Sequence, residues 1–179
     1  RSSFARRMPI QNPVIVVPGI QGTGLEDFYP LPPEEVWSTL RAGATAAGLG
    51  GDYLERIALH PDDLRYEAVE PARVQPTGAL SMAYRDLIDA LRHDLSEKAD
   101  KPTPVFPFGY DWRQDCQRSA DLLSAFIDEV IERTWLLPHY RGDKKSRQVD
   151  LVGHSMGGLV IADCIARHGG ARVRKVVTM

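Results

Sequence analysis

The chain has 179 residues, which is enough for one domain with its own core. Its 43% hydrophobic and 26% charged residues are ordinary for a globular protein, and no apolar run is long enough to cross a membrane. A net charge of −2 without a Lys/Arg stripe excludes the electrostatic footprint of a nucleic-acid-binding protein.

The two cysteines leave the compartment undecided, whereas the ends of the chain are informative. Cys116 and Cys164 both fall in predicted helices, so we expect free, partly buried thiols and no disulfide framework. The chain starts at Arg1 rather than Met and without a hydrophobic signal segment, so we expect any targeting peptide to be absent or already removed. The apolar run 173–179 is typical of a buried strand, so we expect the domain to continue beyond Met179.

The first predicted element is a central parallel strand at 13–17, a continuous β-branched run that ends at Pro18-Gly19. A glycine-rich loop, 19–25, follows it. The spacing G-x-x-G-x-G and the prolines behind the loop disfavour a dinucleotide-binding turn. We interpret the loop as one that presents a backbone N–H to a developing oxyanion.

Residues 26–80 are broken by prolines and predict an insertion of the kind that builds pocket walls. Within it, 34–40 predicts one or two helical turns, 41–51 a small and flexible stretch, and 53–59 a strand. Two interpretations of Trp37 stay open, contact with a lipid surface or packing in a local core.

After the insertion, apolar periodicity predicts helices that alternate with strands. The expected elements are helix 81–95, strand 105–108, helix 115–137, a strand that begins at 149, helix 155–168 and strand 173–179. Alternation of this kind predicts an α/β fold with a mainly parallel, doubly wound sheet.

The most informative pattern lies between the strand at 149 and the helix that follows it. Gly153-His154-Ser155-Met156-Gly157 is a G-x-S-x-G sequence, which places a serine on a sharp strand-to-helix turn. The elbow glycines Gly153 and Gly157 are needed because this turn brings backbones too close together for a Cβ. The following helix directs free N–H groups toward a reacting carbonyl. The pattern predicts acyl-transfer chemistry at Ser155, with a purely structural turn as the alternative.

Three segments together resemble one family, the lecithin:cholesterol acyltransferases. These segments are 13–25, Tyr110-Asp111-Trp112-Arg113, and 153–159. The family also includes phospholipid:diacylglycerol acyltransferases and related phospholipases. The resemblance implies that 1–179 is the N-terminal part of one α/β-hydrolase domain, with an insertion at about 26–80.

The resemblance also implies roles for particular residues. Ser155 would be the nucleophile, and the N–H groups of Ile20 and Met156 would form the oxyanion hole. Asp111 and Arg113 suggest a catalytic interpretation, because Asp111 is a carboxylate at the end of a predicted strand. We instead expect structural roles, with Arg113 paired to a carboxylate and Trp112 packed beside the pocket.

A serine hydroxyl needs a base that is oriented by a third group, and in α/β-hydrolases the chain order is Ser, Asp or Glu, His. After Ser155 the chain offers only Asp163 and His168, both within the elbow helix and directed away from the turn. We expect that His154 packs inside the elbow, and that none of the five histidines is the base; the three that precede the elbow are His60, His93 and His139. The acid, the base and a lid are therefore expected beyond Met179, and the chain alone should be inactive.

The sequence predicts a lipid O-acyltransferase or lipase-type serine hydrolase that acts through an acyl-Ser155 intermediate. Its partner is an ester substrate, with transient contact at a lipid surface, and no nucleic acid. No ligand spacing predicts a metal, and no cofactor is expected. A small-ester esterase and a non-catalytic binding protein of the same fold remain alternatives. Acyl donor and acceptor stay open.

Overall fold

The structure is a computed structural model that describes residues 10–49, 57–59, 72–141 and 147–179. The expected strand at 53–59 lies mostly outside these ranges, and the part within them contradicts it, because Ile57 is helical. His60 and the basic lead-in 1–9 also lie outside the described residues.

Four parallel strands form the central sheet, in the order β5-β1-β6-β7. They are β1 (Val14–Val17), β5 (Val105–Pro107), β6 (Val149–Gly153) and β7 (Val173–Thr178). All four residues of β1 are buried, as expected for a β-branched run covered on both faces. The sequence order of the strands reverses beside β1, which creates a switch point at the carboxyl ends of β1 and β6.

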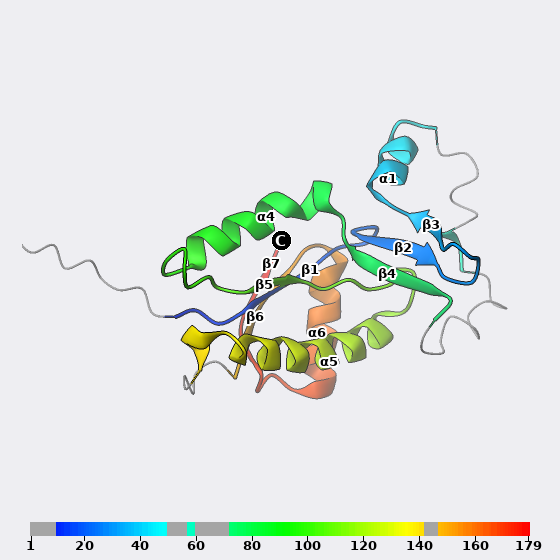
Figure 1. The fold of residues 1–179 in the computed structure, drawn as a ribbon. Coiled ribbons are helices and arrows are strands. Elements are labelled where there is room, and N and C mark those ends of the chain that lie inside the picture. The colour runs from blue at the N-terminus through cyan, green and yellow to red at the C-terminus, as the bar shows by residue number, and fades with distance from the viewer. Residues whose placement is uncertain (1–9, 50–56, 60–71, 142–146) are drawn as a thin grey trace, which may run out of the picture.

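Helices cover both faces of this sheet, which confirms the predicted doubly wound α/β fold (Figure 1). Helix α4 (Ser81–Leu95) lies on one face, and α5 (Cys116–Trp135) and α6 (Met156–His168) lie on the other. Asp115 caps α5 by accepting from the N–H of Arg118. A short 3-10 turn, η1 (Pro138–Tyr140), follows α5.

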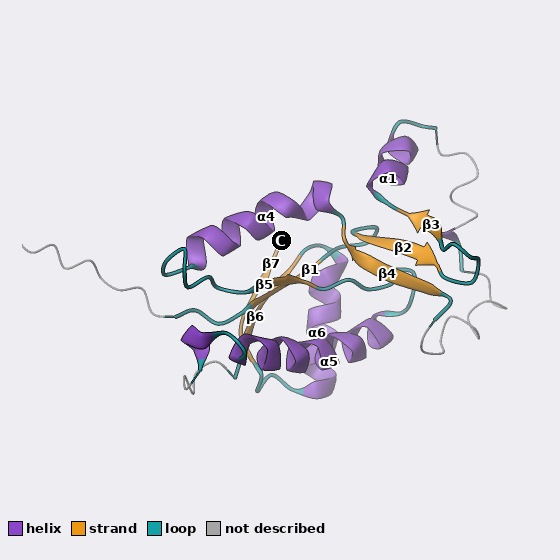
Figure 2. Ribbon diagram, in the orientation of Figure 1, coloured by secondary structure: helices purple, strands orange, loops and turns teal. Residues whose placement is uncertain are grey.

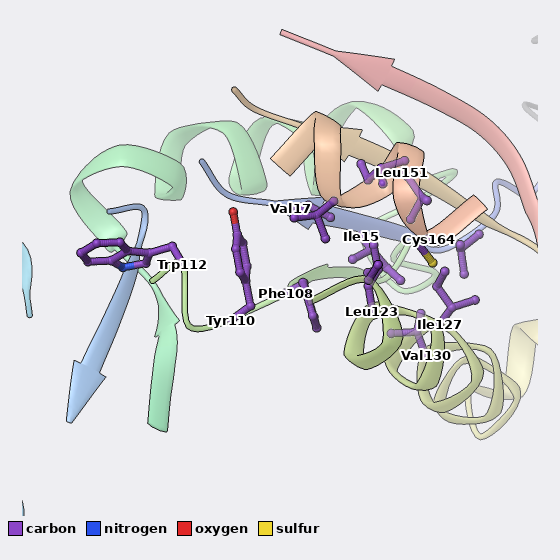
Figure 3. Close-up of a cluster of buried hydrophobic side chains, with 14 of the residues drawn as sticks. Ile15, Val17, Phe108, Tyr110, Trp112, Leu123, Ile127, Val130, Leu151 and Cys164 are labelled. Atoms are coloured by element: carbon purple, nitrogen blue, oxygen red, sulfur yellow. The ribbon is translucent and has the colours of Figure 1, made fainter. Parts of the chain in front are cut away.

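The side chains of β1 divide the core into two clusters. Ile15 and Val17 pack with residues of α5 and α6, such as Leu123 (Figure 3). Val14 and Val16 pack on the other face, in the cluster that contains residues of α4. This alternation is the two-residue period of a strand, and it makes β1 the centre of both layers.

The insertion forms a second, antiparallel sheet in the order β3-β2-β4, which the sequence did not indicate (Figure 2). Its strands are β2 (Thr23–Asp27), β3 (Glu34–Trp37) and β4 (Val74–Ala79). The prediction of helical turns at 34–40 is therefore wrong for β3. The glycine-rich loop is also shorter than expected, because its last residues belong to β2.

Helix α1 (Thr39–Ala46) occupies most of the stretch that we expected to be flexible. Ser38 begins it as an N-cap that accepts from the N–H of Arg41, and the alanines that made the stretch look featureless are good helix formers. Trp37 is only 2% exposed and belongs to the core, which overturns the lipid-contact interpretation of this residue.

The cysteines behave as expected. Cys116 and Cys164 are both free, and Cys164 is buried. Burial raises the pKa of the Cys164 thiol above its ordinary value. Among the described residues, no helix is both long and apolar enough to cross a membrane.

Candidate active site

Ser155 occupies a strained turn between β6 and α6. Its backbone has φ 51° and ψ −123°, a conformation that side-chain-bearing residues rarely adopt. The surrounding structure fixes the turn, because the N–H of Ser155 donates to the carbonyl of Met179 at 3.0 Å and the N–H of His154 donates to that of Val17 at 3.0 Å. Ser155 is exposed, so its hydroxyl is accessible.

The two elbow glycines allow close backbone approach on either side of Ser155. A Cβ on Gly157 would lie 2.2 Å from the carbonyl oxygen of Val17. A Cβ on Gly153 would lie 2.8 Å from Cδ1 of Ile161 and 2.9 Å from the nitrogen of Gly158. Neither position has space for a side chain, so α6 can pack against β1 and β6 only with glycine there.

The loop after β1 lies directly against the elbow. β1 and β6 are hydrogen-bonded neighbours, with Val17 opposite Gly153, so the segments that follow the two strands leave the sheet at the same place. A Cβ on Gly19 would lie only 3.0 Å from Cβ of Ser155. The structure thus brings together two segments that are more than 130 residues apart in sequence.

Two backbone N–H groups beside Ser155 have no hydrogen-bond partner within the described part of the chain, those of Ile20 and Met156. Met156 is the first residue of α6, whose opening N–H groups have no intrahelical acceptor. By contrast, the N–H of Ser155 is used by Met179, and that of Gly157 by the carbonyl of His154. Ile20 and Met156 therefore retain free N–H donors, and that of Met156 lies at the positive end of the α6 dipole.

Four aromatic side chains hold the loop of Ile20, and none of these contacts was predicted. Tyr110 donates to the carbonyl of Pro18 at 2.8 Å, and the hydroxyl of Tyr84 accepts from the N–H of Gly19 at 2.9 Å. The indole N–H groups of two tryptophans also donate to backbone carbonyls, Trp37 to Gln21 in the loop at 2.9 Å and Trp112 to Thr23, the first residue of β2, at 3.0 Å. We call these four residues the aromatic clamp. Only the Tyr110–Arg113 motif signalled it in the sequence.

Asp111 and Arg113 form a bidentate ion pair, which confirms that Arg113 pairs with a carboxylate. Arg113 donates to both carboxylate oxygens, at 2.9 and 2.7 Å, and the two side chains are only 6% and 10% exposed. Trp112, between them in sequence, packs edge-on against Trp37 with ring centroids 5.7 Å apart. The motif therefore stiffens the segment that supplies half of the clamp.

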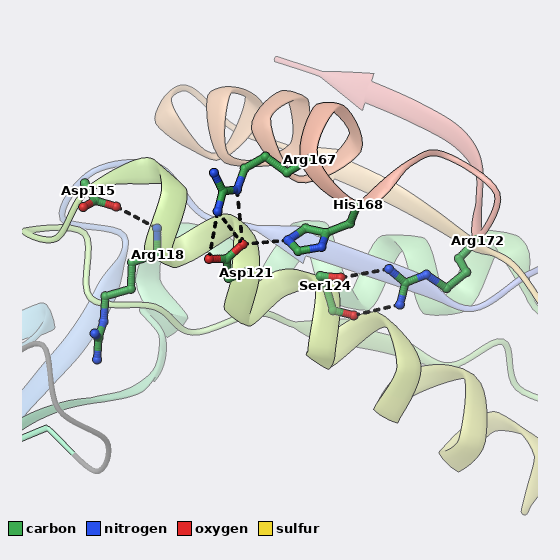
Figure 4. A network of polar contacts seen from close by, with 7 residues as sticks. All are labelled: Asp115, Arg118, Asp121, Ser124, Arg167, His168 and Arg172. Carbon is green, nitrogen blue, oxygen red and sulfur yellow. Dashed lines mark hydrogen bonds and ion pairs between the residues drawn. The ribbon is translucent and has the colours of Figure 1, made fainter.

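Each of the four histidines in the described part of the chain has a partner other than Ser155. Nδ1 of His154 lies 2.9 Å from the hydroxyl of Tyr84, and Nε2 of His168 lies 2.6 Å from Asp121, beside Arg167 (Figure 4). His139 contacts the carbonyl of Pro102, and His93 contacts the carboxylate of Asp94. Within the described ranges, no hydrogen bond joins the Ser155 hydroxyl to a histidine, and no three potential ligands gather at a metal site.

Comparison with known proteins identifies relatives of the fold. No family model matches the chain. It is 24% identical over 160 residues to the uncharacterized protein YJR098C of Saccharomyces cerevisiae, which covers 87% of this chain and 21% of that protein. In the crystal structure of the Tle4–Tli4 complex, a chain superposes with a TM-score of 0.54 at 20% identity, covering 93% of this chain and 45% of that one.

The chain has an α/β-hydrolase-type fold. It spans about a fifth of the yeast protein and less than half of the chain in the Tle4–Tli4 complex. At this level of identity the likeness concerns the fold, so the chemistry of the site is argued from its geometry.

Proposed function

We propose that this chain carries the nucleophile and the oxyanion donors of a serine enzyme that transfers or hydrolyses acyl groups of lipid esters. One observation carries the proposal, the strained and exposed turn at Ser155 with the Gly19 loop packed against it. Backbone strain of about 1–3 kcal/mol persists only where other contacts enforce it, and it clusters at functional sites. A structural turn has no need of an exposed serine in this conformation.

The reaction follows from the groups around the turn. The Ser155 oxygen attacks the ester carbonyl while a base takes its proton, and the tetrahedral oxyanion accepts hydrogen bonds from the N–H groups of Ile20 and Met156. In comparable sites, one such donor stabilises the transition state by about 2.7–4 kcal/mol. Collapse breaks the ester C–O bond, the protonated base returns its proton to the leaving oxygen, and the alcohol departs to leave acyl-Ser155. Attack by an acceptor alcohol then gives transfer, and attack by water gives hydrolysis.

The base and its orienting acid are supplied, in this proposal, by polypeptide beyond Met179. The described histidines support it, because His154 contacts Tyr84 and His168 contacts Asp121. The share of the relatives that the chain spans, 21% and 45%, leaves room for such a continuation. On this basis, residues 1–179 alone hold the nucleophile half of the site and are inactive.

The lipid substrate class rests on the resemblance to the lecithin:cholesterol acyltransferase family in three segments. The segment Tyr110–Arg113 supports it most specifically, since a G-x-S-x-G elbow alone would fit any lipase or esterase. A lid beyond Met179 that excludes water would favour transfer to an alcohol such as a sterol or diacylglycerol.

Labelling by a fluorophosphonate tests the nucleophile. The natural full-length protein should be labelled, and Ser155→Ala should abolish the labelling. Ser81→Ala is a matched control, because Ser81 is also an exposed serine at the start of a helix, and it should label normally. Undiminished labelling of Ser155→Ala would overturn the assignment.

Two further assays separate the alternatives. Esters of short and long acids distinguish a small-ester esterase, which prefers short chains, from a lipid enzyme. A phospholipid supplied with a sterol or diacylglycerol yields a new acyl ester from a transferase and free acid from a hydrolase. A protein that binds these lipids but neither cleaves them nor reacts with the fluorophosphonate would be a non-catalytic member of the fold.

A further inference from the structure

Tyr84 is the member of the aromatic clamp that touches both segments carrying the candidate oxyanion donors, the Gly19 loop and the elbow. Its hydroxyl accepts from the N–H of Gly19, next to Ile20, and lies 2.9 Å from Nδ1 of His154, next to Ser155. The tyrosine comes from α4, so the bridge joins three separate parts of the chain. The other clamp residues hold the loop alone.

The hydroxyl of Tyr84 is buried and closely surrounded by other atoms. Tyr84 is 5% exposed and Gly19 is buried. A Cβ on Gly22 would lie 2.8 Å from the hydroxyl oxygen. The ring of Tyr84 also packs edge-on against that of His154, with centroids 5.9 Å apart. The hydroxyl oxygen of Tyr84 is therefore in contact with both the glycine-rich loop and the elbow histidine.

The hydrogen-bonding capacity of the hydroxyl matches its neighbours. Because the oxygen accepts from Gly19, its own proton can be donated to Nδ1 of His154, which then carries its proton on Nε2. In that arrangement all three groups are satisfied. Loss of the hydroxyl would leave the buried N–H of Gly19 without its partner and free His154 from the loop.

We propose that Tyr84 is a positioning residue that sets the separation of the N–H groups of Ile20 and Met156. The inference rests on the proposed function, because it concerns the oxyanion hole of that same site. Ile20 follows Gly19 directly, and Met156 lies two residues after His154, so the Tyr84 bridge spans the two donors. A transition-state oxyanion needs both donors within about 2.7–3.1 Å at once, whereas substrate binding does not.

Tyr84→Phe in the natural full-length protein tests this role, because it removes the hydroxyl and keeps the ring. Tyr140→Phe is the matched control. Tyr140 is 1% exposed, and its hydroxyl donates to the carbonyl of Gln11 at 2.8 Å, a contact that involves neither the Gly19 loop nor the elbow. The measurements are kcat and KM with a p-nitrophenyl ester, and the affinity of a trifluoromethyl ketone that forms an oxyanion adduct on Ser155.

We expect Tyr84→Phe to lower kcat and trifluoromethyl ketone affinity by about tenfold, less than the 10²–10³ for complete loss of a donor, with KM changed by less than about twofold. Tyr140→Phe should change none of the three. If Tyr84→Phe fails to fold, His154→Leu breaks the same bridge at an exposed position and should give the same loss in kcat and ketone affinity, with KM little changed.

The outcomes separate the two proposals. If Ser155→Ala abolishes fluorophosphonate labelling while Tyr84→Phe matches Tyr140→Phe in kcat and ketone affinity, the positioning role is overturned and the nucleophile stands. A Tyr84→Phe variant in which KM rises and kcat is unchanged also overturns it, since that pattern indicates a binding contact. Labelling that survives Ser155→Ala overturns the proposed function, and the role of Tyr84 with it.

Discussion

The hydroxyl of Tyr110 donates a 2.8 Å hydrogen bond to the carbonyl oxygen of Pro18, 92 residues earlier in the chain. Tyr110 is fully buried, and the backbone of α6 meets the same carbonyl from another side, since a Cβ on Gly157 would lie 2.6 Å from it. Pro18, the residue just before the Gly19 loop, is therefore held between the segment after β5 and α6.

Tyr110→Phe should lower the free energy of unfolding by about 1–3 kcal/mol, because it leaves the buried carbonyl of Pro18 without this donor. Urea unfolding followed by circular dichroism measures the change. Tyr29→Phe is a suitable control, since Tyr29 is 79% exposed, and its effect should stay within about 0.5 kcal/mol. Equal stability of the two variants would contradict the anchoring role of Tyr110.

Alkaline stability should report on the same residue. Burial raises the pKa of Tyr110 above its ordinary value, so the unfolded chain loses this proton at a lower pH than the folded chain does. The contribution is complete below the tyrosine pKa of the unfolded chain, about 10, and is lost as pH rises above it. Urea midpoints above about pH 10 should fall more steeply in the wild type than in Tyr110→Phe.

Relief of strain at the elbow should be measurable. Ser155→Gly and Ser155→Ala both remove the nucleophile, but only glycine adopts φ 51° without steric cost. We expect Ser155→Gly to be more stable than Ser155→Ala by about 1 kcal/mol, with fluorophosphonate labelling abolished in both. Equal unfolding free energies would show that the turn is not strained.

Two glycine-to-alanine substitutions should change the stability of the protein in opposite directions. Gly157→Ala places a Cβ 2.2 Å from a rigid backbone carbonyl, so we expect a loss of about 3 kcal/mol or more, or failure to fold. Gly43→Ala, within α1, meets nothing within 4 Å and should stabilise the protein by about 0.5–1 kcal/mol. Thermal unfolding of both variants measures the contrast.

Acid sensitivity should depend on Asp121, which joins α5 to the end of α6. Hydrogen bonds from His168 first, and then from Arg167, hold the pKa of the Asp121 carboxyl below its ordinary value. A lowered carboxyl pKa contributes stability above the value in the unfolded chain, about 3.9, and this is lost as pH falls through the folded value. Asp121→Asn should therefore flatten the fall in urea midpoint below about pH 4, and an unchanged fall would contradict the contribution of Asp121.

The parallel sheet and its helices could be predicted because their signals are local. Helix 81–95 agrees with α4 in both bounds, since its apolar spacing and the break after it lie within one segment. The antiparallel sheet of the insertion could not be predicted in this way. β4 contains Pro76 and Gly78, which disfavour strands, and it forms by pairing with β2, which lies about 50 residues earlier.

The candidate site also has parts that local sequence predicts and parts that it does not. Its backbone elements follow from the G-x-S-x-G pattern and the glycines after β1, both short and contiguous. The aromatic clamp does not, because its four side chains come from separate segments and meet the loop only after folding. The sequence marked Tyr110 and Trp112 as a motif, yet the backbone groups that they bind became evident only in three dimensions.

The two tryptophans of the clamp also make intrinsic fluorescence a probe of the loop. Of the three tryptophans in residues 1–179, Trp37 and Trp112 are buried with their rings edge to face and donate to the carbonyls of Gln21 and Thr23, whereas Trp135 is 39% exposed. Release of the loop would break both indole hydrogen bonds and admit water, which shifts emission to longer wavelength. In residues 1–179 with Trp135 replaced by Phe, the fluorescence of Trp37 and Trp112 would follow the loop beside Ser155 directly, with no attached dye.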